Sequence, residues 1–221
     1  MTTVTFFFDL DGTLMDSAPG IIASYKVALK ELDVEPPSDE ELRAMVGPPM
    51  HLVFPMLLGE HAPIEEAVAA YREYYQDEGM FIAEPYDGLG EMFDELMRYD
   101  PALYIATSKP HIFADQIADK FGLFGYVQRL FGSELDGTRS DKTELLQFAL
   151  DETGTDPAMS VMIGDRHYDI NGARNNDIPS IGALWGYGEP DELRMAEPDG
   201  MAGHPEEVPE IALDLLGLEV E

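Results

Sequence analysis

The feature that most constrains this chain is the apolar run VTFFFDLDG at residues 4–12, which ends in two acids. Continuous β-prone apolar runs of this length are typical of strands buried on both faces of a parallel sheet. Asp9 and Asp11 follow directly, and a carboxylate is costly to desolvate unless another group compensates for its charge. The sequence therefore predicts a buried strand that carries two acids to the edge of a sheet, where something must offset their charge.

Later apolar runs repeat this pattern. They lie at residues 102–108, 160–165 and 179–184. Helical patterns lie between the later runs, at 110–120 and 140–150, with Pro110 suited to a first helical turn and Ser140 to an N-cap. Alternating strands and helices predict an α/β fold, a Rossmann-like parallel sheet flanked by helices and joined by right-handed crossovers.

Residues 17–83 break this alternation because they contain no convincing strand. Ser38 and Glu41 match a capping box, which predicts a helix start, and a longer helical pattern fills residues 62–79. We therefore expect an all-helical domain inserted after the first strand. The predicted domains are an α/β catalytic core (1–16 and 84–221) and a helical cap (17–83).

Composition limits the partners of the chain. The 44 Asp and Glu outnumber the 13 Lys and Arg, and the formal net charge of −31 would repel nucleic acid and anionic lipid. We therefore expect no nucleic acid and no membrane as partners. The charge suits either a solubilising surface or a salty cytoplasm. Cysteine is absent and the N-terminus resembles neither a signal peptide nor a transmembrane segment, so we expect a cytoplasmic protein. Oligomeric state has no readable signal.

Chemically active side chains gather where the predicted strands and helices meet. Ligands of open α/β sheets bind at the carboxyl ends of the strands. The residues expected there are Asp9, Asp11, Thr107, Ser108, Lys142, Asp165 and Asp169. Each has a simpler role alone: a turn for one Asp, an N-cap for Thr107, a solvated surface position for Lys142. Asp169 could pair with Arg166 or Arg174. The complete set, in this order, favours a functional site over these separate roles.

The chain resembles the haloacid dehalogenase superfamily of phosphohydrolases, and within it the phosphoglycolate phosphatase-like branch. The segments that carry the resemblance are DLDGTLMD (9–16), IATSKP (105–110), SDKTELL (140–146) and MIGDRHYDINGARNND (162–177). The helical insertion is similar to the cap domain of that family. One departure lies beside Lys142, where the chain has RSDKTE and the family often has Arg-Lys-Pro or Gly-Lys-Pro.

Phosphate monoester hydrolysis requires a nucleophile and compensation for a dianion, and these residues can provide both. Asp9 is the expected nucleophile, forming an aspartyl-phosphate, and Asp11 the expected general acid and base. Mg²⁺, for which Mn²⁺ could substitute, would be held by the carboxylates of Asp9 and Asp165, the carbonyl of Asp11 and, through water, Asp169. Phosphate would be bound by Gly12, Thr107, Ser108 and Lys142, the last of which also balances charge in the transition state.

Asp11 favours phosphate chemistry over dehalogenation, because a halide leaving group needs no proton. Small phosphorylated acids such as 2-phosphoglycolate are the first predicted substrates, and a 5′-nucleotidase acting on nucleoside monophosphates is the alternative. A non-enzymatic receiver-like phosphoacceptor module is a remote alternative, which the helical insertion disfavours. Three candidate specificity residues lie in a cap loop at 46–54: Gly47, Pro48 and His51. Arg43 lies just before this loop on the preceding helix, and Lys109 and Arg166 lie beside the site. Lys109 or Arg166 would supply the cation that a carboxylate requires.

Overall fold

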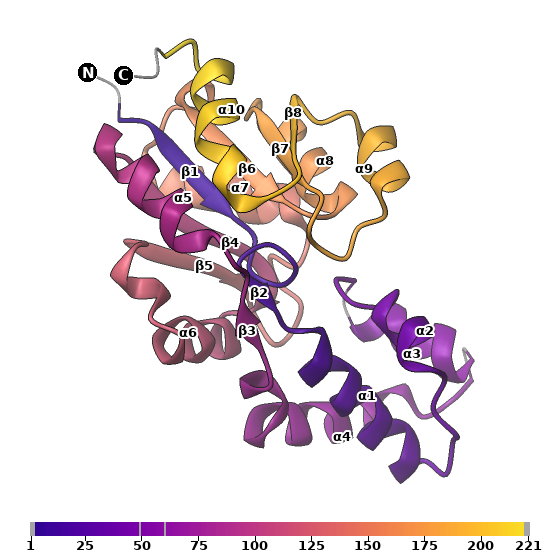
Figure 1. The fold of residues 1–221 in the computed structure, drawn as a ribbon. Coiled ribbons are helices and arrows are strands. Elements are labelled where there is room, and N and C mark those ends of the chain that lie inside the picture. Colours follow the sequence, from indigo (N-terminus) through magenta and orange to yellow (C-terminus); the bar gives the residue numbers. More distant parts are fainter. Residues whose placement is uncertain (1–2, 49, 60, 219–221) are drawn as a thin grey trace. The chain divides into compact units, whose positions relative to one another are not determined.

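A computed structural model describes residues 3–48, 50–59 and 61–218 of the chain (Figure 1). The chain divides into two compact units. The core unit consists of Met1–Met15 and Pro85–Glu221, and the helical unit of Asp16–Glu84. Two short strands that pair with each other, β2 (Met15–Asp16) and β3 (Glu84–Pro85), lie at the chain crossings. That the helical unit serves as a cap stays a prediction.

The core unit is built on a six-stranded sheet. Its strands are β1 (Thr5–Phe8), β4 (Ala102–Pro110), β5 (Arg129–Ser133), β6 (Ser160–Gly164), β7 (Ser180–Ala183) and β8 (Gly200–Ala202). Their order is β5-β4-β1-β6-β7-β8, and each neighbouring pair is parallel. Phe6, Phe7 and Phe8 are fully buried in the centre of this sheet. The predicted α/β class is confirmed, and the first apolar run forms the central strand.

Helices cover both faces of this sheet. They are α5 (Leu89–Leu96), α6 (His111–Lys120), α7 (Lys142–Thr153), α8 (His167–Asn175), α9 (Pro190–Ala196) and α10 (Val208–Leu215). The chain moves from β1 outward to β4 and β5, then crosses to β6 and moves outward through β7 and β8. Right-handed crossovers therefore place α5 and α6 on one face and α7, α8 and α9 on the other. The contacts between helices are consistent with this arrangement, because α7 packs on α8 and α8 packs on α9. Helix α10 packs on α5 (Figure 1).

The order in which the chain adds strands to the sheet reverses at β1, which pairs with both β4 and β6. Phe8 is in register with Ile105 of β4 and Ile163 of β6, and the Asp9 N–H donates to the Ile163 carbonyl at 2.9 Å. Residues that follow these three strands therefore reach the same edge of the sheet. In open α/β sheets, ligands bind at this edge beside the point of reversal.

The helical unit contains α1 (Ala18–Glu31), α2 (Asp39–Arg43), α3 (Met50–Leu58) and α4 (Ile64–Asp77). Four aromatic side chains join α1, α3 and α4: Tyr25, Phe54, Tyr71 and Tyr75. The predicted capping box is confirmed, because the Ser38 hydroxyl accepts from the Glu41 N–H at 3.3 Å and the Glu41 carboxylate accepts from the Ser38 N–H at 2.9 Å. Among the described residues of either unit, no helix combines the length and apolarity needed to cross a membrane.

Local predictions differ from the structure at the cap loop and at one N-cap, and one strand was not predicted. The expected cap loop at 46–54 is wrong in its second half, because α3 begins at Met50; Pro49 lies outside the described residues. The N-cap of α7 is Asp141 and not Ser140, since the Asp141 carboxylate accepts from the N–H groups of Thr143 and Glu144. Strand β5, at the edge of the sheet, was not anticipated.

Gly20 lets two parts of the helical unit approach closely. A Cβ atom added to Gly20 of α1 would lie 1.9 Å from the Gly79 carbonyl oxygen. We therefore expect Gly20→Ala to lower the unfolding free energy by ~1–3 kcal/mol, the usual cost of overpacking. Gly90→Ala in α5 is the matched control, because nothing lies within 4 Å of its added Cβ. Thermal unfolding followed by circular dichroism measures both, and equal melting temperatures would refute the close approach.

Candidate active site

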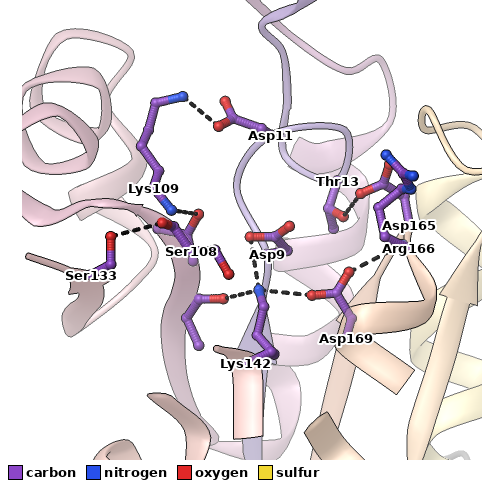
Figure 2. Close-up of polar contacts among 12 residues, drawn as sticks. Asp9, Asp11, Thr13, Ser108, Lys109, Ser133, Lys142, Asp165, Arg166 and Asp169 are labelled. Atoms are coloured by element: carbon purple, nitrogen blue, oxygen red, sulfur yellow. Dashed lines mark hydrogen bonds and ion pairs between the residues drawn. The ribbon is translucent and has the colours of Figure 1, made fainter. Parts of the chain in front are cut away.

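Lys142 is the centre of a cluster of charges at the carboxyl edge of the sheet (Figure 2). Its ammonium lies 3.1 Å from Asp9 Oδ1 and 2.7 Å from Asp169 Oδ1, and donates to the Ala106 carbonyl at 2.8 Å. Asp9 follows β1, Asp169 lies in the first turn of α8, and Ala106 lies within β4. The Lys142 side chain is only 3 % exposed. The structure therefore brings two predicted site residues, Asp9 and Asp169, to a third, the buried cation of Lys142.

Local structure explains how Lys142 reaches this position. It is the first residue of α7, directly after the Asp141 cap, so its side chain starts at the edge of the sheet. Its stem passes over Gly172 of α8, where an added Cβ would lie 2.7 Å from Lys142 Cγ. The lysine thus reaches the cluster although its segment lacks the proline that is common in the family.

Asp9, Asp165 and Asp169 form a second set of contacts within the same cluster. Each offers a carboxylate oxygen, and these oxygens lie within 4.8 Å of one another, so the three residues could hold a metal ion. Asp165 and Asp169 are buried. Asp169 Oδ2 also accepts from the Arg166 backbone N–H at 3.1 Å. The Asp11 carboxylate is not part of this group; its carbonyl was the predicted ligand.

The Asp165 carboxylate is fixed by two groups that sequence reasoning missed. Thr13 donates its hydroxyl hydrogen to Oδ1 at 3.2 Å, and the Tyr187 backbone N–H donates to Oδ2 at 2.7 Å. Thr13 lies within the quoted DLDGTLMD segment, but only its acids and glycine were given roles. Tyr187 acts through its backbone, which leaves no signal in its residue type. Trp185, on the same loop, donates its indole N–H to the Thr13 carbonyl at 3.0 Å.

Glycines allow these loops to pass so close to Asp165. Gly12 has φ +86°, and a Cβ there would lie 2.3 Å from Asp165 Oδ2. A Cβ at Gly188 would lie 1.9 Å from the Asp165 carbonyl oxygen. Any larger residue at either position would displace the carboxylate or the loop. The Gly12 backbone therefore lies next to the acidic cluster. Its role in phosphate binding stays a prediction.

Crowding of acids raises the pKa of two carboxyl groups. Burial, followed by the charges of Asp169 and Asp9, raises the pKa of Asp165 from 3.8 to about 8. Burial also raises the pKa of Asp9 to about 6, although Lys142 opposes the shift. Burial alone would lower the pKa of Lys142, but Asp169 and Asp9 raise it above its usual value. One lysine therefore leaves the cluster short of positive charge, which favours a bound cation.

The end of β4 supplies the polar residues expected to bind phosphate. Thr107 is buried, and its hydroxyl oxygen accepts from the Lys109 N–H at 3.2 Å. Ser108 contributes its carbonyl, which accepts from the Ser133 hydroxyl at 2.8 Å. The Lys109 ammonium pairs with Asp11 Oδ2 (Figure 2). Every predicted residue of the catalytic and metal sets thus lies along the carboxyl edge of the sheet.

The candidate specificity residues have acidic partners of their own. Arg166 pairs with Glu192 at 3.0 Å, and the same Glu192 oxygen lies 2.6 Å from Nδ1 of His167. The Asp169 carboxylate forms its ion pair with Lys142 at 2.7 Å and accepts from the backbone N–H of Arg166. Arg174 donates to the Glu197 carbonyl at 2.8 Å. The simpler role considered for Asp169 therefore does not describe its contacts.

Within the helical unit, the remaining specificity candidates are spread over two helices and the segment between them. Arg43 ends α2 and lies 3.7 Å from an Asp16 oxygen. Gly47 has φ +115° and Pro48 follows it, while His51 is an exposed residue of α3.

Comparison with known proteins identifies the class to which this fold and site belong. A family model described as haloacid dehalogenase-like hydrolase matches residues 6–183. The chain belongs to this family, and the resemblance inferred from its motifs is confirmed. With its phosphatase and nucleotidase relatives, it is a phosphoric monoester hydrolase.

Individual relatives carry different names. A 5′-nucleotidase of Pseudomonas aeruginosa is 40% identical over 86% of this chain and 87% of its own length. The tyrosine-protein kinase PtkA of Mycobacterium tuberculosis is 38% identical over 83% and 63%. A phosphoglycolate phosphatase of Agrobacterium fabrum is 27% identical over 87% and 84%. Among solved structures, a predicted phosphatase from Clostridium acetobutylicum has a TM-score of 0.89 at 35% identity, covering 97% of this chain and 100% of its own.

The raised pKa of Asp165 predicts how metal-free stability depends on pH. Between its ordinary pKa of 3.8 and about 8, the folded chain binds a proton that the unfolded chain does not. Stability in chelator should therefore rise as pH falls through this interval. Asp165→Asn removes the charge, and the Thr13 hydroxyl can turn to accept from the new amide. In chelator at about pH 9 the variant should unfold at a higher temperature than the wild type, with a gap that closes toward about pH 5.

The control for this experiment is Asp115→Asn, which removes an exposed acid of α6. Both variants relieve the general repulsion of a chain with net charge −31 by the same amount. Added Mg²⁺ should stabilise the wild type and the control more than Asp165→Asn. If the Asp165 variant were the less stable protein in chelator at high pH, the electrostatic description of the cluster would be wrong.

Proposed function

We propose that this hydrolase cleaves small phosphate monoesters with Mg²⁺ through an aspartyl-phosphate on Asp9. The observation that carries the proposal is the buried cluster in which Lys142 faces Asp9 and Asp169 while Asp165 completes a group of three carboxylates. This arrangement follows a central strand that ends at the ligand-binding edge of the sheet. It pairs a fixed nucleophile with groups that can neutralise a phosphate dianion.

The cluster fits a divalent cation. Oδ1 of Asp9 and Oδ1 of Asp169 are buried and accept no hydrogen bond of good geometry from the described residues, although Lys142 lies within ion-pair distance. Carboxylate oxygens are the ligands that Mg²⁺ prefers. Asp9 and Asp165 would bind the ion directly, and Asp169 would bind it through a coordinated water. When bound, Mg²⁺ would supply the positive charge that lets a phosphate approach this acidic edge.

The reaction would then proceed in two half-reactions. Asp9 attacks phosphorus as the bond from phosphorus to the alcohol oxygen breaks, and Asp11 gives that oxygen its proton. Water next attacks the phosphorus of the aspartyl-phosphate and gives a proton to Asp11 as the bond to Asp9 breaks. Lys142 stabilises charge on Asp9 in both halves, while Thr107 and the Gly12 backbone face the phosphoryl oxygens.

Hydrolysis of p-nitrophenyl phosphate tests this mechanism. Activity should disappear in chelator and return with Mg²⁺ or Mn²⁺. Asp9→Asn should abolish turnover with the fold retained, because an amide oxygen is a poor nucleophile, and Asp11→Asn should lower it ~10²–10⁴-fold. Asp115→Asn, an exposed control, should leave the rate unchanged. Normal activity in Asp9→Asn would remove the covalent mechanism, and full activity in chelator would remove the metal.

Two substrate classes can be weighed against the site. Small phosphorylated acids, favoured first from the sequence, require a cation from Lys109 or Arg166, and both cations have acidic partners. The relative named 5′-nucleotidase is more similar to this chain than the one named phosphoglycolate phosphatase. These observations support nucleoside monophosphates as the preferred substrates, with 2-phosphoglycolate as the alternative.

A panel of 2-phosphoglycolate, sugar phosphates and nucleoside monophosphates, ranked by kcat/KM, tests this preference. We expect a nucleoside monophosphate to lead. We also propose that the helical unit caps the site and selects the substrate. If so, His51→Ala or Arg43→Ala should change the ranking more than the rate with p-nitrophenyl phosphate. A tenfold lead for 2-phosphoglycolate would reverse the preference and leave the phosphatase assignment standing.

A further inference from the structure

Lys109 and Asp11 form an ion pair that the proposed mechanism does not use. The ammonium donates to Asp11 Oδ2, and the two side chains are 6 % and 15 % exposed. Burying such a pair is costly unless its geometry is good and further hydrogen bonds satisfy its remaining polar atoms. The chain has 13 Lys and Arg against 44 acids, so cations are scarce. One of them is nevertheless buried against the residue proposed as general acid and base.

A bulge at the end of β4 holds Lys109 in place. Thr107 is in register with Gly132 of β5, and Pro110 with Ser133, so Ser108 and Lys109 are extra residues on β4. Bulges of this kind re-aim side chains beside active sites. The Lys109 N–H donates to the Thr107 hydroxyl at 3.2 Å, and Ser133 donates to the Ser108 carbonyl at 2.8 Å (Figure 2). Both polar groups of the peptide that joins Ser108 to Lys109 are therefore held by hydrogen bonds.

The two oxygens of Asp11 have different surroundings. Oδ2 is held by Lys109, whereas Oδ1 is buried and accepts no hydrogen bond from any described residue. Figure 2 shows the carboxylate directed toward Lys109, apart from the Asp9–Lys142–Asp169 contacts. A carboxyl group with one anchored oxygen can rotate little, so the position of the other oxygen is set as well.

We propose that Lys109 is the positioning residue for Asp11: its ammonium anchors Oδ2 and thereby presents Oδ1 as the oxygen that gives and takes the proton. This inference rests on the proposed function, in which Asp11 protonates the leaving alcohol. Oδ2 can accept from Lys109 in both states of Asp11, because the carbonyl oxygen of a carboxylic acid is also an acceptor. The proton moves from Oδ1 to the leaving oxygen in the first half-reaction and returns from water in the second.

Leaving-group dependence separates this role from a structural one. An alkyl alcohol must be protonated as it leaves, whereas p-nitrophenolate leaves readily without a proton. The constant kcat/KM reports steps up to loss of the alcohol, and so excludes hydrolysis of the aspartyl-phosphate. A misdirected Asp11 should therefore lower kcat/KM for an alkyl phosphate much more than for p-nitrophenyl phosphate.

The experiment compares the best alkyl phosphate of the substrate panel with p-nitrophenyl phosphate at saturating Mg²⁺. Lys109→Met removes the ammonium and keeps an unbranched stem. We expect kcat/KM to fall ~10–10²-fold more for the alkyl phosphate, a part of the full contribution of a general acid. Lys109→Arg should restore part of this loss. Lys120→Met, which removes an exposed lysine of α6, controls for the change in net charge. It should leave kcat/KM unchanged for both substrates.

A double-mutant cycle completes the test. Asp11→Asn should show the same selective loss, and adding Lys109→Met to it should cost nothing further, because Lys109 acts through Asp11. Melting temperatures of the variants establish that each is folded at the assay temperature. Equal losses for both substrates in Lys109→Met, or additive losses in the double variant, would overturn the positioning role.

The outcomes also distinguish this inference from the proposed function. If Asp11→Asn shows no leaving-group selectivity, Asp11 is not the general acid and the proposed mechanism fails. If Asp11→Asn is selective and Lys109→Met is not, only the role of Lys109 fails. A rise in KM confined to 2-phosphoglycolate in Lys109→Met would make Lys109 a contact for the substrate carboxylate, and would also overturn the positioning role.

Discussion

The contact between the Lys142 ammonium and two carboxylates is the interaction on which the site depends. Lys142 begins α7, Asp9 follows β1, and Asp169 lies in the first turn of α8, so one cation joins three elements. A buried ammonium is stable only with such partners, and buried carboxylates need such a cation. Loss of Lys142 would leave the negative charges of Asp9 and Asp169 without this cation. The stability of the site and its proposed chemistry therefore both depend on the Lys142 ammonium.

Lys142 does not neutralise the whole cluster. Burial and the charges of Asp169 and Asp9 raise the pKa of Asp165 to about 8, although the charge of Arg166 opposes the shift. Thr13 and Tyr187 hold its carboxylate by hydrogen bonds, and Gly12 and Gly188 let the two loops close around it. The fold therefore maintains a carboxylate in an unfavourable position. Strained or poorly solvated groups of this kind concentrate at functional sites, where a ligand supplies what the protein lacks.

Sequence patterns predicted those parts of the molecule that depend on the identity of the side chains. The three consecutive phenylalanines of β1 can be accommodated only in a buried strand, and the acids that follow it were placed at the correct edge. Strand β5 was missed because RLFGS, at the edge of the sheet, is short and has no alternating pattern. Helix α3 was missed because it follows Gly47 and Pro48 and contains Pro55, all of which usually interrupt helices. Tyr187 contributes a backbone N–H, which any residue except proline possesses.

Two lysines in different positions allow two neighbouring acids to behave differently. Asp9 and Asp11 are separated by one residue, yet Lys142 from α7 pairs with the first and Lys109 from the bulge of β4 with the second. A shared cation would hold both carboxylates in one environment. Separate cations leave Asp9 beside Asp165 and Asp169, while the Asp11 carboxylate is directed away from them, toward Lys109 (Figure 2). Assigning opposite roles to paired carboxylates in this way requires distinct surroundings for each. The bulge in β4 provides the second of these surroundings, because without the two extra residues Lys109 would follow the register of the strand.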